Sequence, residues 1–303
     1  MCGIFGMMSF SAAPFRESWL HDASRTLSHR GPDDGDLFIS PDRSVALGHR
    51  RLSIIDLSAN GRQPMWNEDG RVAIVFNGEI YNFKELRREL SAKGHRFRSE
   101  TDTEVALHGY EEYGQEILDR LRGMFAFALW DATSGHFLLA RDRVGKKPLY
   151  VSRMSHVFLF ASEIKALRRH PDVTRDLNPG AVRDYLTFGY VPAPETMFRA
   201  IHKVPAGFMM QVRQDGDVTC REYWDARIGG NEHIGFRDCV GEVKRLVEKA
   251  VEKRLVADVP IGAFLSGGVD STIVTGLMQR MASGPVKTCS VGFDAGPATQ
   301  KVN

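Results

Sequence analysis

The chain has few cysteines and no long apolar run. Its cysteines are Cys2, Cys220, Cys239 and Cys289. They form no Cys-x-x-Cys pair and have no regular spacing, so neither a zinc site nor a disulfide framework is supported. The longest apolar run, at 124–130, is far shorter than the roughly 18 to 20 residues that cross a bilayer. The first residues, MCGIFGMMSF, lack the basic and cleavage segments of a secretory signal. We therefore expect a cytoplasmic protein with no membrane partner.

The chain also lacks an excess of charge of one sign. It contains 40 basic and 38 acidic residues, which gives a formal net charge of +2. The basic residues occur as scattered pairs among acids, whereas a nucleic-acid binder carries a clustered basic face. We therefore expect no nucleic-acid partner. A hydrophobic fraction of 43% over 303 residues is ordinary for a globular protein and is enough for about two domains.

The pattern of residues 1–200 predicts a layered α+β domain. Apolar residues on both faces of 71–77 indicate a sheet that is covered on both sides. A helix is predicted at 82–93, with Asn82 as its N-cap, and another at 103–113. Strand-like segments then follow one another closely through 123–162, which favours antiparallel pairing. Sheets and helices in this order predict sheet layers covered by helices, and we end this first domain near residue 200.

The remaining sequence predicts a connection at 201–235 and a second domain at 236–303. A helical pattern at 236–255 precedes a continuous apolar strand at 259–265. A Gly-rich turn, a helix at 271–281 and a strand at 286–293 follow, so this domain is α/β with parallel strands. Two parallel strands leave open edges. We expect that most of a larger domain is absent from the chain, the alternative being a natural stop with a degenerate second half.

Cys2 could supply both a nucleophile, its thiol, and a base, its α-amine. Removal of Met1 would place its thiol and a free α-amine on one residue. The pKa of an α-amine is near ~7.7 to 8.0 and that of a thiol is near ~8.5, so the amine can accept the thiol proton at neutral pH. Gly3 would let a bound substrate approach the backbone closely. Alone, this tripeptide is a weak signal.

Motifs spread along the first 150 residues make the signal specific. They are MCGIFG at 1–6, HRGPDD at 29–34, GHRRLSIIDL at 48–57, FNGEIYN at 76–82, SETDTEV at 99–105, GMFAFALWD at 123–131 and ARDRVGKKPLY at 140–150. Together they resemble, in order, the class II glutamine amidotransferase domain of the glutamine-hydrolysing asparagine synthetases. The resemblance implies an N-terminal-nucleophile hydrolase fold, in which two antiparallel sheets lie between helices.

The resemblance also implies a glutaminase site. Cys2 matches the nucleophile that attacks the side-chain amide of glutamine, and Asn77 with Gly78 matches the oxyanion hole. Arg51 matches the residue that binds the α-carboxylate and Asp102 the partner of the α-amine. The other glutamine-binding residues that it implies are Leu52, Ser53, Ile54, Ile55 and Glu79.

Three nearby residues are given structural roles. His29 and His49 suggest a Cys-His dyad, but an N-terminal nucleophile already carries its own base. We therefore assign both histidines to the structure. Arg30, in the motif HRGPDD, is expected to order the N-terminus through hydrogen bonds.

SGGVDS at 266–271 follows a predicted strand and opens a helix, where a Gly-rich loop can bind phosphates. It is not a Walker A loop, because no Gly-Lys-Ser/Thr follows. It resembles the pyrophosphate loop of ATP pyrophosphatases. That likeness implies ATP and Mg²⁺ as cofactors, with Asp270 as the metal ligand. The implied ATP-binding residues are Phe264, Leu265, Ser266, Gly267, Gly268, Asp270, Ser271 and Val291.

The sequence therefore predicts a glutamine-dependent asparagine synthetase that transfers ammonia to an ATP-activated aspartate. Synthetase activity is doubtful for this chain, because the remaining catalytic segment of the family does not follow. One alternative is a stand-alone glutaminase, or an amidotransferase that acts on another carboxylate such as a sugar acid. An alternative of another class is a non-catalytic remnant that binds glutamine or a partner subunit. Self-association into a homo-oligomer is left open.

Overall fold

The computed structural model describes residues 1–11, 17–227, 229 and 234–292. The chain divides into two units, Met1–Arg227 and Ile228–Asn303. Among the described residues, no helix has both the length and the apolar character needed to span a membrane. The predicted strand at 286–293 ends at a residue outside the described part, as does the end of the predicted second domain.

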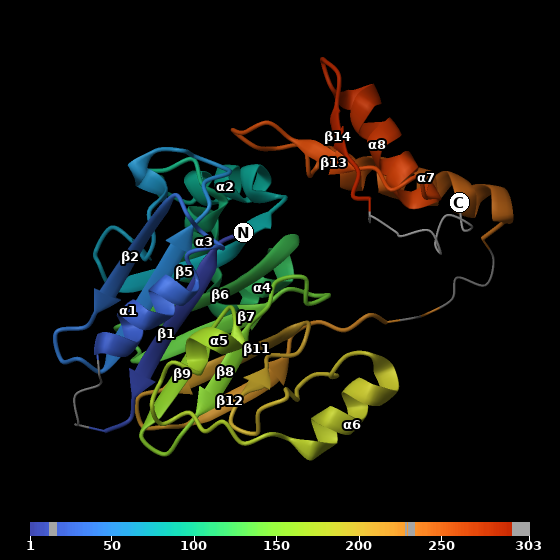
Figure 1. The fold of residues 1–303 in the computed structure, drawn as a ribbon. Coiled ribbons are helices and arrows are strands. Elements are labelled where there is room, and N and C mark those ends of the chain that lie inside the picture. Colours follow the sequence, from blue (N-terminus) through green and yellow to red (C-terminus); the bar gives the residue numbers. More distant parts are fainter. Residues whose placement is uncertain (12–16, 228, 230–233, 293–303) are drawn as a thin grey trace. The chain divides into compact units, whose positions relative to one another are not determined.

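The first unit contains two six-stranded antiparallel sheets (Figure 1). In order across the first sheet, the strands are β10 (His202–Lys203), β8 (Tyr150–Arg153), β9 (Val157–Ala161), β1 (Gly3–Ser9), β3 (Val45–Arg51) and β2 (Asp34–Ile39). In the second they are β12 (Val218–Glu222), β11 (Phe208–Arg213), β7 (His136–Arg141), β6 (Gly123–Asp131), β5 (Val72–Ile80) and β4 (Met65–Trp66). The predicted antiparallel strands in 123–162 are confirmed as β6 to β9.

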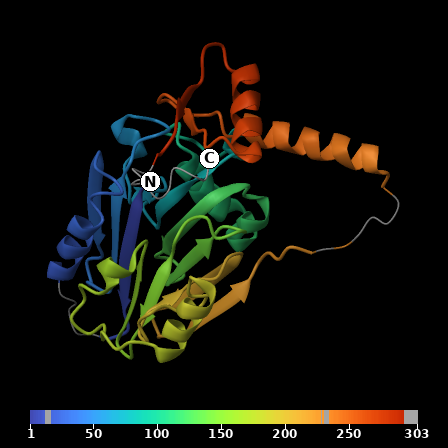
Figure 2. The same ribbon diagram turned by 45° about the vertical axis from the view of Figure 1, so that its right-hand side comes forward.

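Three helices of the first unit, α1 (Glu17–Thr26), α3 (Asp102–Tyr113) and α5 (Ile164–Leu167), cover the outer faces of the sheets. This unit also contains α2 (Phe83–Ala92), α4 (Ile117–Arg120) and α6 (Pro179–Phe188), with 3₁₀ turns at Ala59–Gly61 and Gly114–Glu116. The helices α1 and α5 contact β1, β3 and β9 on one side, while α3 contacts β4 and β5 on the other. Figure 2 shows the blue helix α1 and the teal helices on opposite sides of this unit. The predicted arrangement of two sheets between helices is confirmed.

Two apolar layers hold the first unit together. One lies between the sheets and includes Ile4, Val75, Phe137 and Phe160, all fully buried. The other lies between the first sheet and helices α1 and α5, where Trp19 is buried. Both faces of β5 are buried because the strand lies between the two-sheet core and α3. This explains the doubly apolar pattern at 71–77.

The boundary of the first unit lies later than predicted. Strands β10, β11 and β12 join its two sheets, and β11 pairs with β7 from Met209 to Arg213. The segment 201–227 therefore belongs to the sandwich and not to a connection, and the predicted end near residue 200 is too early. Short strands rich in polar residues carry little periodicity, so the pattern did not separate them from a linker.

The start of α2 is also held differently from the prediction. Asn82 occupies the N-cap position, but its side chain makes no capping hydrogen bond. It donates to the carbonyl of Arg120 at 3.0 Å and accepts from the backbone amide of Arg122 at 2.9 Å instead. Asn82 thus ties α2 to the segment that leads into β6.

The second unit contains α7 (Phe236–Glu252), β13 (Gly262–Phe264), α8 (Val269–Met281) and β14 (Lys287–Cys289). The two strands are parallel, as predicted, with Gly262 opposite Lys287. The expected buried character of the first strand is wrong, because Gly262 and Phe264 are exposed. Its only partner in the described part is β14, so much of its apolar surface has nothing to pack against.

Candidate active site

Cys2 stands immediately before β1, at the edge of a cavity of about 190 Å³. Its Sγ lies 3.4 Å from the backbone nitrogen of Leu52 and 3.6 Å from the carbonyl oxygen of Leu52. Arg30 donates from Nε to the carbonyl of Cys2 at 2.8 Å and pairs with Glu163 at 3.0 Å. Arg30 thus orders the N-terminus, as the sequence predicted. Burial raises the pKa of the Cys2 thiol, which the Leu52 amide partly offsets.

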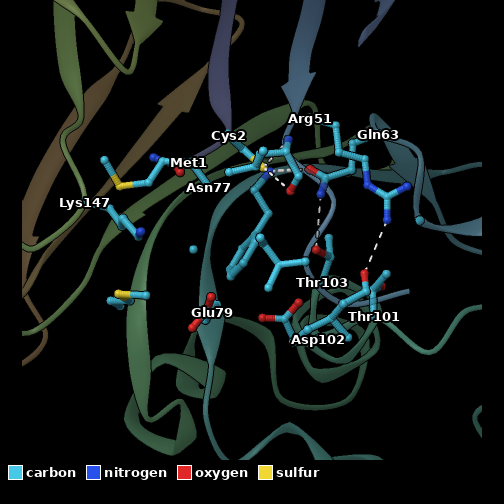
Figure 3. Close-up of a pocket in the computed structure, with 17 residues that line it drawn as sticks. Met1, Cys2, Arg51, Gln63, Asn77, Glu79, Thr101, Asp102, Thr103 and Lys147 are labelled. Carbon is cyan, nitrogen blue, oxygen red and sulfur yellow. Dashed lines mark hydrogen bonds between the residues drawn. The ribbon is translucent and has the colours of Figure 1, made fainter. Parts of the chain in front are cut away.

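The cavity brings nearly all the predicted glutaminase residues together (Figure 3). Those that line it are Cys2, Arg51, Leu52, Ile54, Ile55, Asn77, Gly78, Glu79 and Asp102. Ser53 does not line it, and its backbone amide donates instead to Asp33 at 2.8 Å. Ser53 is thus the predicted glutamine-binding residue that the cavity does not include, and its role in binding stays a prediction.

Asn77 and Gly78 lie near the end of β5. Asn77 is fully buried, yet neither atom of its amide group has a hydrogen-bond partner within the described chain. A buried amide without partners is costly, so such groups point to a ligand or to a catalytic role. Gly78 is required by space, because a Cβ there would lie 2.3 Å from the carbonyl oxygen of Met124. The backbone of β6 therefore packs directly against this wall of the cavity.

Arg51, at the end of β3, is buried and fixed by backbone carbonyls. Its guanidinium group donates to Ser58 at 2.9 Å, to Ile55 at 3.4 Å and to Asp56. Gly61 makes room for it, since any Cβ there would collide with the guanidinium group. The loop after β3 thus holds a positive charge at the cavity wall.

Asp102 is the first residue of α3 and is buried. Its Oδ2 accepts from the backbone amide of Ile80 at 2.7 Å. Burial and the nearby charge of Glu79 raise the pKa of Asp102 to about 7, against the opposing effect of the Ile80 amide. A cation beside Asp102 would therefore stabilise its charged carboxylate. Figure 3 shows Asp102 across the cavity from Cys2.

Sequence reasoning missed several residues of the cavity, notably Gln63, Thr103 and Lys147. Gln63 accepts from the Phe76 amide at 2.6 Å and donates to Thr103 at 3.2 Å, so it braces β5 against α3. No motif points to Gln63. Lys147, by contrast, lies in the motif ARDRVGKKPLY, which could have indicated it.

Neither predicted structural histidine lines the cavity. His49 is buried, and its Nε2 lies 3.1 Å from the carbonyl of Phe76. Burial lowers the pKa of His49 to about 4, so it is neutral at pH 7. His29 is exposed and lies 2.9 Å from Glu163. The geometry gives Cys2 no histidine base among the residues that line the cavity.

The predicted nucleotide loop forms an open hollow in the second unit. Phe264, Leu265, Ser266, Gly267 and Val291 line it, together with Cys289 and Ser290. Gly268, Asp270 and Ser271 do not line it, but they lie at the start of α8.

Hydroxyl groups close this loop. Ser271 accepts from the backbone amide of Ser266 at 3.3 Å, and the two hydroxyls lie 3.1 Å apart. Gly267 has φ +83°, a conformation that favours glycine. All the hydrogen-bonding groups of the loop therefore remain near solvent.

Comparison with known proteins identifies both parts of the chain. A family described as the glutamine amidotransferase domain matches residues 1–224, and one described as asparagine synthase matches 242–301. The chain is 36% identical to asparagine synthetase [glutamine-hydrolyzing] 3 of Bacillus subtilis and 38% identical to asparagine synthetase [glutamine-hydrolyzing] 1 of the same organism. Each match covers 97% of this chain but 48% and 46% of the relative. The chain thus spans about half the length of these curated relatives.

A solved structure supports the fold. The glutamine phosphoribosylpyrophosphate amidotransferase of B. subtilis, complexed with ADP and GMP, superposes with a TM-score of 0.54. It is 16% identical, and the match covers 95% of this chain and 65% of that one. This likeness concerns the fold alone and confirms the predicted N-terminal-nucleophile hydrolase sandwich. The chain belongs to the glutamine amidotransferase domain family, and its residues 242–301 match a family described as asparagine synthase.

Proposed function

We propose that the first unit hydrolyses glutamine to glutamate and ammonia, with Cys2 as the nucleophile. The observation that carries the proposal is the buried, unpartnered amide of Asn77 in the cavity that Cys2 borders. A preorganised donor of this kind stabilises a developing oxyanion better than it stabilises the ground state. The family of the first unit agrees with this chemistry.

In the proposed reaction, removal of Met1 frees the α-amine of Cys2. The amine takes the thiol proton while sulfur attacks the side-chain carbon of glutamine. The amide of Asn77 and the backbone amide of Gly78 stabilise the resulting oxyanion. The C–N bond then breaks, the proton returns to the departing nitrogen, and ammonia leaves a thioester on Cys2. Water attacks the thioester, which releases glutamate and restores the thiol.

The charged residues of the cavity would orient the substrate. Arg51 presents a fixed guanidinium group to the α-carboxylate, and Asp102 presents a buried carboxylate to the α-ammonium group, with Glu79 nearby. Leu52, Ile54 and Ile55 line the same space. A cation for the α-carboxylate and a carboxylate for the α-ammonium group favour glutamine over an amide that lacks the α-amino acid group.

A glutamate-release assay with the Met1-processed chain tests the proposal. We expect Cys2→Ala to abolish glutamate release while glutamine still binds, as measured by calorimetry. Cys239→Ala, at an exposed helix position, serves as the matched control and should retain full activity. If the processed, unmutated chain releases no glutamate, the non-catalytic remnant replaces the proposed enzyme.

We also propose that the ammonia is destined for an ATP-activated aspartate. The segment at 242–301 belongs to a family described as asparagine synthase, and the relatives carry asparagine synthetase in their names. The hydroxyls of Ser266 and Ser271 and the glycine backbone of the loop suit a triphosphate, and the Asp270 carboxylate suits Mg²⁺. Bound ATP would supply the leaving group that activates the carboxylate, with pyrophosphate as product.

A stand-alone glutaminase is the second candidate, and the exposure of the nucleotide loop favours it. Aspartate-dependent release of pyrophosphate from ATP distinguishes the two. Pyrophosphate formed by the full chain would overturn the glutaminase alone. Release that requires a sugar acid in place of aspartate would change the acceptor and keep the ammonia-transfer reaction.

A further inference from the structure

Lys147 lies in a loop whose backbone is fixed from two sides. The Asp142 carboxylate accepts hydrogen bonds from the backbone amides of Lys147 and Lys146, each at 2.9 Å. The Arg141 guanidinium group donates to the carbonyls of Lys147 at 2.8 Å and Gly145 at 2.7 Å. Gly145 has φ +66°, which allows the loop to turn between β7 and β8. The position of the Lys147 side chain therefore follows from a rigid backbone.

The side chain of Lys147 is directed into the glutamine cavity. Lys147 is 6% exposed and lines the cavity, whereas the adjacent Lys146 is exposed. Figure 3 shows Lys147 below Met1, on the side of the cavity away from Asp102. Within the described chain, no hydrogen bond or ion pair of 4 Å or less holds its ammonium group. A buried lysine without a fixed partner is rare unless it serves a ligand or a reactive group.

Lys147 also balances the charge of the cavity. The charged side chains that line it are two cations, Arg51 and Lys147, and two carboxylates, Glu79 and Asp102. The Arg51 guanidinium group is already engaged by three backbone carbonyls at its own wall. The N-terminal amine and Arg51 lower the pKa of the Cys2 thiol, and Asp102 raises it. Lys147 adds a second side-chain cation to the cavity wall, and the negative charge of Cys2 in turn raises the pKa of Lys147.

Burial lowers the pKa of the Lys147 ammonium group, while the charges of Glu79 and Cys2 act in the opposite direction. An unperturbed lysine has a pKa near ~10.4, and the negative charges of Glu79 and Cys2 favour the charged form of Lys147. The other charges that face Cys2 are the N-terminal amine, Arg51 and Asp102. Arg30 and Asp142 are the remaining charges that face Lys147.

We propose that the ammonium group of Lys147 stabilises the thiolate of Cys2 and so sets the pH at which this nucleophile becomes reactive. The thiol proton passes to the α-amine, and the negative charge left on sulfur is offset by Lys147. Lys147 is a positioning residue in this scheme, since it acts through Cys2 and forms no bond to glutamine. The inference deepens the proposed glutaminase and rests on it.

Alkylation of Cys2 by iodoacetamide as a function of pH tests the inference without requiring turnover. The modified N-terminal peptide is followed by mass spectrometry in the full, Met1-processed chain. In Lys147→Met we expect the apparent pKa of the Cys2 thiol to rise by about one unit, which lowers its alkylation rate at pH 7 about tenfold. Lys147→Arg should restore most of the rate, and the matched control Lys146→Met should behave as the unmutated chain.

An unchanged alkylation pKa in Lys147→Met would overturn the inference. Circular dichroism and the thermal midpoint of each variant separate this outcome from misfolding, and Lys147→Gln provides a second neutral side chain of similar length.

Kinetics of glutamate release distinguish an effect on the nucleophile from an effect on substrate binding. The acid limb of kcat/KM should shift with the alkylation pKa while KM stays constant. A raised KM with an unchanged pKa would assign Lys147 to substrate binding instead. If the unmutated chain alkylates as expected but releases no glutamate, the proposed function fails and the inference about the thiolate stands.

Discussion

The two units of the chain bury their apolar residues to very different extents. The first unit has continuous buried layers between its sheets and under α1 and α5. The buried cluster of the second unit consists of Val251, Leu277 and Met278 within the described residues. Large apolar side chains that remain exposed there are Phe236, Val240, Val243, Leu246, Phe264, Val269, Ile273 and Val291. Residues of the same type thus form a core in one unit and a surface in the other.

This difference extends to the two candidate sites. In the glutamine cavity, the buried Arg51 is held by backbone carbonyls of the loop after β3, and the buried Asp102 by the Ile80 amide of β5. In the nucleotide loop, the hydroxyls of Ser266 and Ser271 contact each other and that of Ser271 donates to Gly268 within the same loop, with Ser266 exposed and Ser271 half-buried. A site whose polar groups are held by a core is preorganised, whereas a site on a thin layer depends on further contacts to fix its geometry. The comparison predicts that the glutamine cavity is preorganised and that the geometry of the nucleotide loop is not yet fixed by its own unit.

Hydrogen exchange of the two units gives the largest expected contrast. Amides of β6 and β7 lie in the buried sheet, and we expect them to exchange at least about 10³-fold more slowly than amides of α8. The physical reason is that α8 opens at the cost of a small cluster, while β6 opens only with the whole sandwich. Peptide-resolved deuterium uptake measures both at once. Equal protection of the two units would contradict the comparison.

Substitution of Asn77 tests whether the cavity is preorganised for catalysis. We expect Asn77→Ala to lower kcat for glutamate release about 10²- to 10³-fold with little change in KM, because an oxyanion donor acts mainly in the transition state. Asn67 is the matched control, since its buried amide is already engaged by Glu111 and by the backbone of β5. Asn67→Ala should cost stability and leave kcat intact. Equal loss of kcat in both variants would assign Asn77 to structure.

The sequence predicted the parts of this fold that carry strong periodicity or specific motifs. The helices at 82–93 and 103–113 and the strands from 123 to 162 were found where expected. Strands β10 to β12 and helix α6 were not assigned. Of these, β10 and β12 are short and polar and look like linkers. The burial of 259–265 was overestimated, because an apolar strand is buried only when neighbours cover it.

The candidate site divides in the same way. Motifs named the groups that would contact glutamine, such as Arg51 and Asp102, since their chemistry requires particular residue types. Gln63 lies in no motif and enters the cavity only through tertiary packing, whereas Lys147 lies in a motif to which no role was assigned. Ser53 belongs to the same motif as Arg51 but lies outside the cavity lining, because a contiguous motif cannot show that one of its backbone amides donates elsewhere. Sequence thus predicts chemistry better than it predicts orientation.

The buried His108 shows how the first unit stabilises a protonated imidazole in its interior. It is buried on α3, with Nδ1 2.6 Å from Glu111 and Nε2 3.7 Å from Glu104. Burial alone would lower the pKa of His108, but these carboxylates raise it to about 9. The folded pKa lies above the unfolded value near ~6.5, so the stabilisation is complete below about pH 6.5 and is lost as the pH rises through 9.

We expect His108→Leu to lower the free energy of unfolding of the first unit by about 3 kcal/mol at pH 6.5 and to flatten its decline toward pH 9. Urea denaturation followed by tryptophan fluorescence is specific, because all four tryptophans lie in residues 1–227. The exposed His21 provides the control variant His21→Leu. A decline of the same slope in His108→Leu would show that other groups cause it.

The pH dependence of glutamine binding gives the smallest but most specific effect. The pKa of Asp102 is about 7 in the empty cavity, raised chiefly by burial, so part of the population is protonated at neutral pH. Only the carboxylate can pair with the α-ammonium group of glutamine. KM for glutamine should therefore rise up to about tenfold for each pH unit below 7 and become constant above 8.

Asp102→Asn should have a raised KM that no longer varies with pH. Asp270→Asn, at an exposed carboxylate in the second unit, should keep the wild-type profile. A KM that is constant from pH 5.5 to 8 in the unmutated chain would mean that the charge of Asp102 does not contribute to binding of the α-ammonium group of glutamine. The advantage of the first unit would then lie in the oxyanion hole and the nucleophile, and not in recognition of the substrate's charge.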